Sequence, residues 1–221
     1  MPFIVGEDAK QVKEILSKLS NKVKLVYFTQ ELECQYCRET HQLMQELIEL
    51  GDGKIELETY NFITDKDRVE KYKIDKIPAT VVSSGDKNFG IRYYGIPSGY
   101  EFSSLLEDIQ QVANGEPSVS EETKKQIEKI TQPLRLQVFV TPTCPYCPSA
   151  VLMAHKLAML NENITADMVE ATEFPHLSLR YNVQGVPRTM IGEKSAIEGA
   201  LPEPHFVQRV LDAYKNLYPD N

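Results

Sequence analysis

Hydrophobic and polar positions follow the same order of helix and strand patterns twice along the chain. In the first half, helical spacing of apolar residues over 8–19 precedes a continuous apolar run over 23–28, which is typical of a buried strand. Helical spacing returns over 34–50, and alternating positions over 54–60 predict a second strand. A short polar helix over 65–72, a hairpin over 76–95 and an amphipathic helix over 100–113 complete this half. The predicted order is therefore α, β, α, β, α, β, β, α.

The second half repeats this order after NGEPSVS at 114–120, a segment rich in turn-forming residues. Ser118 and Glu121 predict a capping box at the start of its first helix. The clearest internal match pairs YKIDKIPAT at 72–80 with YNVQGVPRT at 181–189, where tyrosine, proline and threonine keep the same register. We therefore predict two domains of the same fold, one over 1–117 and one over 118–221.

Composition and charge narrow the classes of function. Of 221 residues, 42% are hydrophobic and 25% are charged, which is typical of a soluble globular protein with a core in each half. The formal net charge of −8 argues against binding to nucleic acid or to an anionic membrane, since both require clustered lysine and arginine. The first residues lack the basic start and long apolar core of a secretory signal, and no apolar stretch is long enough to span a bilayer. We expect a soluble, cytoplasmic protein.

All four cysteines lie in two C-x-x-C motifs, ECQYCRET at 33–40 and TCPYCPSA at 143–150. Each motif stands between a predicted buried strand and the helix that follows it. The free N–H groups and the dipole at a helix N-terminus stabilise a thiolate, so the first cysteine of each pair becomes more acidic. A thiolate at Cys34 or Cys144 can attack a foreign disulfide, and Cys37 or Cys147 can then resolve the mixed disulfide. These four cysteines are the candidate catalytic residues.

A metal site is the alternative interpretation of the same cysteines. Two C-x-x-C pairs that share a zinc ion are typically separated by about 15 to 20 residues. Here roughly a hundred residues separate the pairs, and each pair has a complete α/β unit around it. This spacing favours redox chemistry without a metal. The competing hypothesis is a zinc or iron–sulfur site that uses all four thiolates, or a redox-inert interaction module.

Each motif is followed about forty residues later by a short proline element, IPAT at 77–80 and VPRT at 186–189. The paired motifs and these elements resemble the two-domain protein disulfide oxidoreductases of hyperthermophilic archaea and bacteria, and CPYC is also similar to the glutaredoxin motif. The resemblance extends over the whole chain. It implies an α/β fold with two tandem thioredoxin-like domains, each a central mixed sheet flanked by helices.

The resemblance also implies a substrate groove. In the thioredoxin fold the later proline is cis, which predicts cis peptide bonds at Ile77–Pro78 and Val186–Pro187. In related proteins the backbone before that proline pairs with an extended substrate chain, so Ile77, Pro78, Val186 and Pro187 are the candidate substrate-binding residues. The alternative is that both prolines are ordinary first residues of strands.

From the resemblance we expect a protein dithiol–disulfide oxidoreductase that reduces disulfides in protein substrates, with isomerisation as a further activity. The disulfide exchange itself needs no cofactor and no metal. Electrons must still reach the chain, and the resemblance implies a flavin-dependent, NAD(P)H-using partner similar to thioredoxin reductase. Neither motif has the histidine that eukaryotic disulfide isomerases carry between their cysteines. This difference argues against a dedicated oxidase.

The two motifs differ in charge and stiffness. Glu31 and Glu33 precede Cys34, whereas neutral threonines precede Cys144, and nearby negative charge disfavours a thiolate. Pro145 also stiffens the second loop. We therefore predict that the C-terminal CPYC site is the more reactive one.

One element of the thioredoxin pattern is missing. Thioredoxins carry a buried aspartate on the strand before the first cysteine, where it accepts the proton of the resolving thiol. Here the matching positions hold Val138 and, with a one-residue insertion, Tyr27. Glu58 and Glu170 on the following strands are candidate replacements. Their alternative role is to face water or to cap the next helix.

Overall fold

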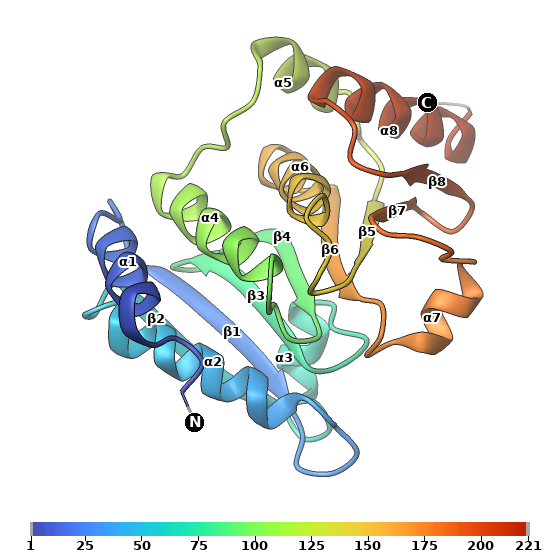
Figure 1. Cartoon of the computed structure of the whole chain (residues 1–221). Coiled ribbons are helices and arrows are strands. Elements are labelled where there is room, and N and C mark those ends of the chain that lie inside the picture. The colour runs from blue at the N-terminus through green and yellow to red at the C-terminus, as the bar shows by residue number, and fades with distance from the viewer. Residues whose placement is uncertain (1, 220–221) are drawn as a thin grey trace.

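The computed structural model describes residues 2–219, and its elements follow the predicted order in both halves (Figure 1). The first half contains α1 (Gly6–Ser17), β1 (Val23–Thr29), α2 (Cys37–Leu50), β2 (Ile55–Asn61), α3 (Lys66–Lys71), β3 (Ala79–Ser84), β4 (Lys87–Tyr94) and α4 (Glu101–Asn114). The second half contains α5 (Glu121–Ile127), β5 (Leu134–Val140), α6 (Cys147–Leu160), β6 (Ile164–Glu170), α7 (Pro175–Arg180), β7 (Arg188–Ile191), β8 (Ser195–Glu198) and α8 (Glu203–Leu217). The predicted α/β fold class is confirmed. Over residues 2–219, no helix has the length and apolar character that crossing a membrane requires.

The eight strands form one mixed sheet in the order β2-β1-β3-β4-β6-β5-β7-β8. Within each half the first two strands are parallel and the hairpin is antiparallel. β4 then pairs in parallel with β6, with Ile91 opposite Ala166, and this pairing joins the central sheets of the two halves into one (Figure 1). Edge strands carry unpaired N–H and C=O groups, so this pairing removes one exposed edge from each half.

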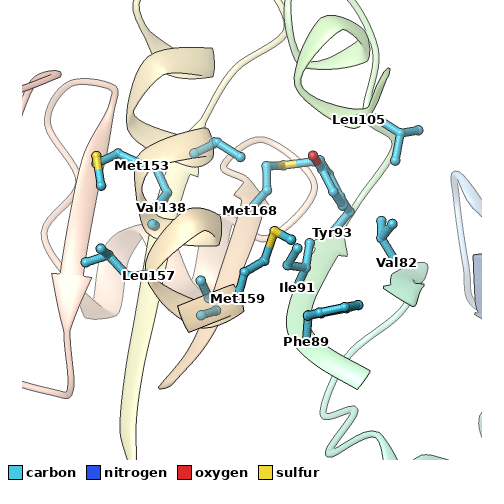
Figure 2. Close-up of a cluster of buried hydrophobic side chains, with 14 of the residues drawn as sticks. Val82, Phe89, Ile91, Tyr93, Leu105, Val138, Met153, Leu157, Met159 and Met168 are labelled. Carbon is cyan, nitrogen blue, oxygen red and sulfur yellow. The ribbon is translucent and has the colours of Figure 1, made fainter. Parts of the chain in front are cut away.

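Helices cover the two faces of the sheet unequally. Side chains of α1, α2, α4, α5, α6 and α8 contribute to one large cluster on the first face, and the short helices α3 and α7 pack on the opposite face. The large cluster contains residues of both halves. Figure 2 shows Tyr93 of β4 next to Met168 of β6, and Met159 of α6 near Ile91. The hydrophobic core is therefore continuous across the boundary between the halves.

A buried ion network crosses the same boundary. Asp167 of β6 is fully buried and accepts hydrogen bonds from Arg92 Nε at 2.6 Å and from Arg135 Nε at 2.7 Å. Arg135 also pairs with Asp75, which contacts Lys76. Burial opposes the ionisation of Asp167, but the positive charges of the two arginines outweigh it and hold its pKa below the ordinary value. Arg92 of the first half and Arg135 of the second half thus both pair with the carboxylate of Asp167.

The cap of α5 differs from the predicted one. Ser120, not Ser118, is the N-cap, and its Oγ accepts the backbone N–H of Thr123. The carboxylate that completes the cap comes from Glu203 of α8, which accepts the N–H of Ser120 at 2.8 Å. The predicted capping box at Ser118 was wrong because a residue distant in sequence supplies the second hydrogen bond.

Candidate active site

Both C-x-x-C motifs lie at the same edge of the sheet. The strand pairings give β1 and β5 the same direction, and each motif follows the carboxyl end of its strand. α2 begins at Cys37 and α6 at Cys147, so each pair stands at the N-terminus of a 14-residue helix. The free N–H groups of such a terminus stabilise an anion. The predicted placement of the motifs between strand and helix is confirmed.

Each pair is closed as a disulfide, with Cα atoms 5.5 Å apart. In both pairs the first cysteine is the more exposed one. Cys34 is half-buried whereas Cys37 is only 4% exposed, and Cys144 is 7% exposed whereas Cys147 is fully buried. The attacking sulfur must be accessible to a substrate disulfide that arrives from solvent. The resolving sulfur needs no such access, because it reacts only with its own partner cysteine. The gradient in exposure therefore suits disulfide exchange.

The separation of the two pairs bears on the metal hypothesis. Three strands, β3, β4 and β6, lie between β1 and β5. At about 4.8 Å per strand, the two motifs stand roughly 19 Å apart along the sheet edge. Zinc–sulfur bonds are about 2.3 Å long, so four sulfurs held this far apart cannot coordinate one ion. Within residues 2–219, no group of three or more His, Cys, Asp or Glu side chains is placed to hold a metal ion.

The predicted cis peptide bonds are present at Ile77–Pro78 and Val186–Pro187. Both prolines are buried and directly precede a strand, β3 or β7. In the second half, the Sγ of Cys144 lies 3.7 Å from the carbonyl oxygen of Val186. The backbone before the cis-proline is thus next to the first sulfur of the motif.

Tyr27 stands where thioredoxins carry the buried aspartate. Its hydroxyl donates to the carbonyl oxygen of Cys37 at 2.6 Å, and His41 stacks on its ring with 5.5 Å between centroids. Burial raises the pKa of Tyr27 to about 12, so the phenol stays protonated near neutral pH. Tyr27 therefore positions the start of α2 and does not accept a proton from a thiol. Val138, at the matching position of the second half, has no titratable group.

The two carboxylates predicted as replacements are engaged in local contacts. Glu58 pairs with Lys24 at 2.8 Å and accepts from Tyr60, and the hydrogen bond from Lys24 lowers its pKa. Glu170 accepts hydrogen bonds from the hydroxyl and the backbone N–H of Thr172, in the turn that leads to α7. Glu170 is buried and holds this turn, but it does not cap α7, whose N-cap is Phe174 without a side-chain hydrogen bond.

Glu101, the first residue of α4, is a buried carboxyl that sequence patterns miss. Ser104 donates to its Oε2, and its Oε1 has no hydrogen-bond partner among the described residues. Burial raises its pKa to about 7. The N–H of Tyr100 donates to the carbonyl oxygen of Pro142 at 3.0 Å, which ties this end of α4 to the second motif. In the sequence, Glu101 is an ordinary acidic residue in the first turn of a helix.

Large apolar side chains are exposed around both motifs. Leu32, in the loop before Cys34, is 78% exposed, and a shallow hollow of about 710 Å³ lies between it and Ile63. Tyr146, inside the second motif, is 71% exposed, and Tyr100 is also exposed. Exposed apolar side chains grouped beside a reactive pair suit contacts with a polypeptide.

Comparisons with solved structures agree with this geometry. A protein disulfide oxidoreductase from Aeropyrum pernix superposes with a TM-score of 0.89 and 27% identity, over 96% of this chain and 94% of that one. AhpF, part of the alkylhydroperoxide reductase of Enterococcus faecalis, superposes with a TM-score of 0.85 and 28% identity, over 94% of this chain and 99% of that one. The family model described as a thioredoxin domain matches residues 134–212.

Curated relatives are longer proteins. An alkyl hydroperoxide reductase component of Staphylococcus epidermidis is 30% identical over 146 residues, which are 66% of this chain and 27% of that protein. An NADH dehydrogenase of Bacillus subtilis is 27% identical over 139 residues, which are 63% of this chain and 27% of that protein. The resemblance to the two-domain protein disulfide oxidoreductases is confirmed. The chain has the thioredoxin fold, two C-x-x-C disulfides and the features of a disulfide oxidoreductase.

Proposed function

We propose that the chain is a protein dithiol–disulfide oxidoreductase that reduces disulfides in protein substrates, with isomerisation as a second activity. One observation carries the proposal. In each motif, the more accessible cysteine before a helix is bonded to a buried cysteine that begins it. The similarity to a protein disulfide oxidoreductase over nearly the whole chain supports the same activity here.

The reaction proceeds in two exchanges. In the reduced chain, the thiolate of Cys34 or Cys144 attacks one sulfur of a substrate disulfide. The substrate S–S bond breaks, a mixed disulfide forms, and the first substrate sulfur leaves as a thiolate that takes a proton from water. The thiol of Cys37 or Cys147 then loses its proton to water. The resulting thiolate attacks the sulfur of Cys34 or Cys144 in the mixed disulfide. The second substrate thiol leaves, so the substrate gains two electrons and the pair becomes a disulfide.

We assign substrate contact to the cis-proline loops, at Ile77, Pro78, Val186 and Pro187. The contact between Val186 and the sulfur of Cys144 supports this assignment. Pairing between main chains depends little on side-chain identity, so it suits unrelated polypeptides. The exposed apolar residues beside each motif would hold the unfolded segments around a substrate cysteine.

The exchange needs no resident cofactor, but its electrons must come from a partner. We propose a flavin-dependent, NAD(P)H-using reductase similar to thioredoxin reductase. The matches to an NADH dehydrogenase and to a component of an alkyl hydroperoxide reductase support a donor of this class. We also propose a cytoplasmic location and a domain boundary at residue 117, between α4 and α5.

Catalysed reduction of insulin by dithiothreitol, followed by turbidity, tests the proposal. The parent protein should accelerate precipitation, Cys34→Ser and Cys144→Ser should each lower the rate, and the double variant should abolish the acceleration. Ser149→Ala, an exposed change in the first turn of α6, is the matched control and should leave the rate unchanged. A double variant as active as the parent contradicts the proposal. So does protein whose four thiols resist mild oxidation, because that result favours a redox-inert module.

A further inference from the structure

A groove lies between α1 and α4, which run side by side over the first face of the sheet (Figure 1). Its volume is about 410 Å³. Its walls are mainly apolar and come from three helices and the loop after β4, at Val12, Ile15, Leu43, Ile96, Phe102 and Leu106. Hollows of roughly 300 to 1,000 Å³ with apolar walls are typical of binding sites. We call this hollow the α1–α4 groove.

The α1–α4 groove is closed at one end and open at the other. Beyond the end of α1, the hydroxyl of Ser20 and the side-chain amide of Asn21 both donate to the carbonyl oxygen of Ala113 at 2.8 Å. These bonds tie the ends of the two helices together. The residues of α4 that line the groove belong to its first half, over 102–106. α4 follows β4, whose carboxyl end lies at the same sheet edge as the two motifs, so the groove opens toward that edge.

The open end of the groove leads to the second C-x-x-C pair. A shallower hollow of about 630 Å³ lies there, lined by Gly99, Tyr100, Ser103, Pro142 and Thr143. Gly99 and Ser103 also line the groove. A Cβ atom at Gly99 would collide with the carbonyl oxygen of Pro142, so glycine allows this close contact between the loops. Because Thr143 directly precedes Cys144, the two hollows form one depression that extends from the groove to the attacking cysteine.

The distance from the cysteine to the groove determines which part of a substrate reaches it. Pro142 lies two residues before Cys144, so their Cα atoms are at most about 8 Å apart. Packed helices stand about 8 to 10 Å apart, so the middle of the groove lies roughly 5 Å further on. An extended chain advances about 3.3 Å per residue. A substrate residue about three to five positions from the reacting cysteine therefore reaches the groove.

We propose that the α1–α4 groove binds an apolar side chain of the substrate polypeptide, about three to five residues from the cysteine that Cys144 attacks. The inference rests on the proposed function and adds a preference among protein substrates. The occupant is part of the substrate, because the groove is continuous with the reacting pair. Among the described residues that line the groove, Asp8 is the only charged one. An acidic segment is therefore repelled, whereas burial stabilises a leucine or phenylalanine side chain.

This contact complements the main-chain pairing that we assign to Val186. Pairing between main chains depends little on side-chain identity, whereas apolar walls distinguish leucine from serine. The groove shares no lining residue with the hollow at Leu32 and Ile63 beside the first motif. The preference should therefore belong to the second pair and be absent from the first.

A chain carrying Cys34→Ser and Cys37→Ser isolates the second pair for the test. The substrates are short peptides with one cysteine joined to thionitrobenzoate, and attack of Cys144 on the peptide sulfur releases this coloured thiolate. One peptide has leucine four positions from the cysteine on both sides, and its partner has serine there. In stopped-flow measurements the leucine peptide should react about tenfold faster, as expected when most of a leucine side chain becomes buried. Leucine directly beside the cysteine should give no such gain, because it does not reach the groove.

Two variants obstruct the groove in different ways. Ile15→Asn places a polar amide in its wall, and Ser103→Trp fills the place where the two hollows meet. Both should bring the leucine and serine peptides to equal rates. Neither should change the rate with dithiobis(nitrobenzoate), a disulfide too small to reach the groove, and this rate shows that each variant is folded and reactive. Lys13→Asn, an exposed change on α1, is the matched control and should keep the preference.

Three results would overturn the proposal. They are equal rates for the two peptides in the unobstructed chain, a preference that survives in both variants, and the same preference in a chain that keeps only the first pair. A second copy of the chain is the alternative occupant, so a dimer in sedimentation that Ile15→Asn converts to a monomer also overturns it. A chain that releases no colour from either peptide or from the small disulfide overturns the proposed function instead, so the two failures are distinguishable.

Discussion

The two halves share one order of elements but differ where the sheet joins them. β3 and β4 have six and eight residues, whereas β7 and β8 have four residues each. β4 pairs with strands on both sides, while β8 ends the sheet. A short edge strand limits pairing with other chains, and a central strand gains from every added pair. Similar sequence patterns thus form strands of different length, depending on where each strand lies in the sheet.

The two sites differ as well. Cys34 is half-buried and follows exposed acidic residues, whereas Cys144 is nearly buried and contacts the carbonyl oxygen of Val186. Glu101 of the first half lies at the end of α4 that is tied to the second motif. The halves are therefore alike in fold, but the surroundings of the second site include a contact from the first half.

Among the changes that we predict, Asp167→Asn should have the largest effect on the stability of the joined halves. The change leaves the buried charge of Arg92 without its carboxylate, while the partly exposed Arg135 keeps Asp75, so we expect the free energy of unfolding to fall by about 3 to 5 kcal/mol. Urea unfolding of the full chain measures this loss. Glu121→Gln, which removes an exposed pair with Lys124, is the control and should leave the stability almost unchanged. A loss no larger than that of the control would mean that the halves do not depend on the network.

Glu101→Gln tests the buried carboxyl through pH. Its folded pKa of about 7 lies above the ordinary value of 4.5, so folding favours the protonated form. The stability that Glu101 contributes is complete below about pH 4.5 and is lost as the pH rises through about 7. Glutamine cannot ionise, so the variant should gain on the parent with rising pH, by up to about 3 kcal/mol. Urea unfolding across this range measures the gain.

The control for this prediction is Glu49→Gln, which changes an exposed carboxyl and should show no such trend. A difference between Glu101→Gln and the parent that stays constant with pH would show that the carboxyl does not change its protonation on folding.

Alkylation rates compare the two attacking cysteines directly. In chains that keep one C-x-x-C pair, we expect reduced Cys144 to react about tenfold faster than reduced Cys34 below neutral pH, because Glu31 and Glu33 disfavour the Cys34 thiolate. Iodoacetamide labelling against pH measures both rates. Changing Glu31 and Glu33 to glutamine should narrow the gap. The greater exposure of Cys34 acts in the opposite direction, so equal rates or a faster Cys34 would show that access outweighs charge.

Several features of the site could not be found from local sequence. Glu58 and Glu170 hold equivalent positions on the strands that follow the two motifs, which made them candidate proton acceptors. In the structure Glu58 pairs with Lys24, and Glu170 accepts a hydrogen bond from Thr172. Glu101 belongs to the first half but lies near the motif of the second half. No residue spacing within one repeat therefore identifies it. The cap of α5 was misplaced for the same reason, since Glu203 completes it from α8.

Sequence patterns were sufficient for the order of helices and strands and the position of both C-x-x-C motifs, while the two cis peptide bonds were predicted from the resemblance to a known family. The order and the motif positions depend on periodicity and on residue types within a few positions, which act through local backbone preferences. The joining of two sheets into one, the ion network at Asp167 and the buried carboxyl of Glu101 became visible only in the packed chain. They depend on contacts between residues far apart in sequence and on burial, which shifts a pKa and is a property of the whole fold.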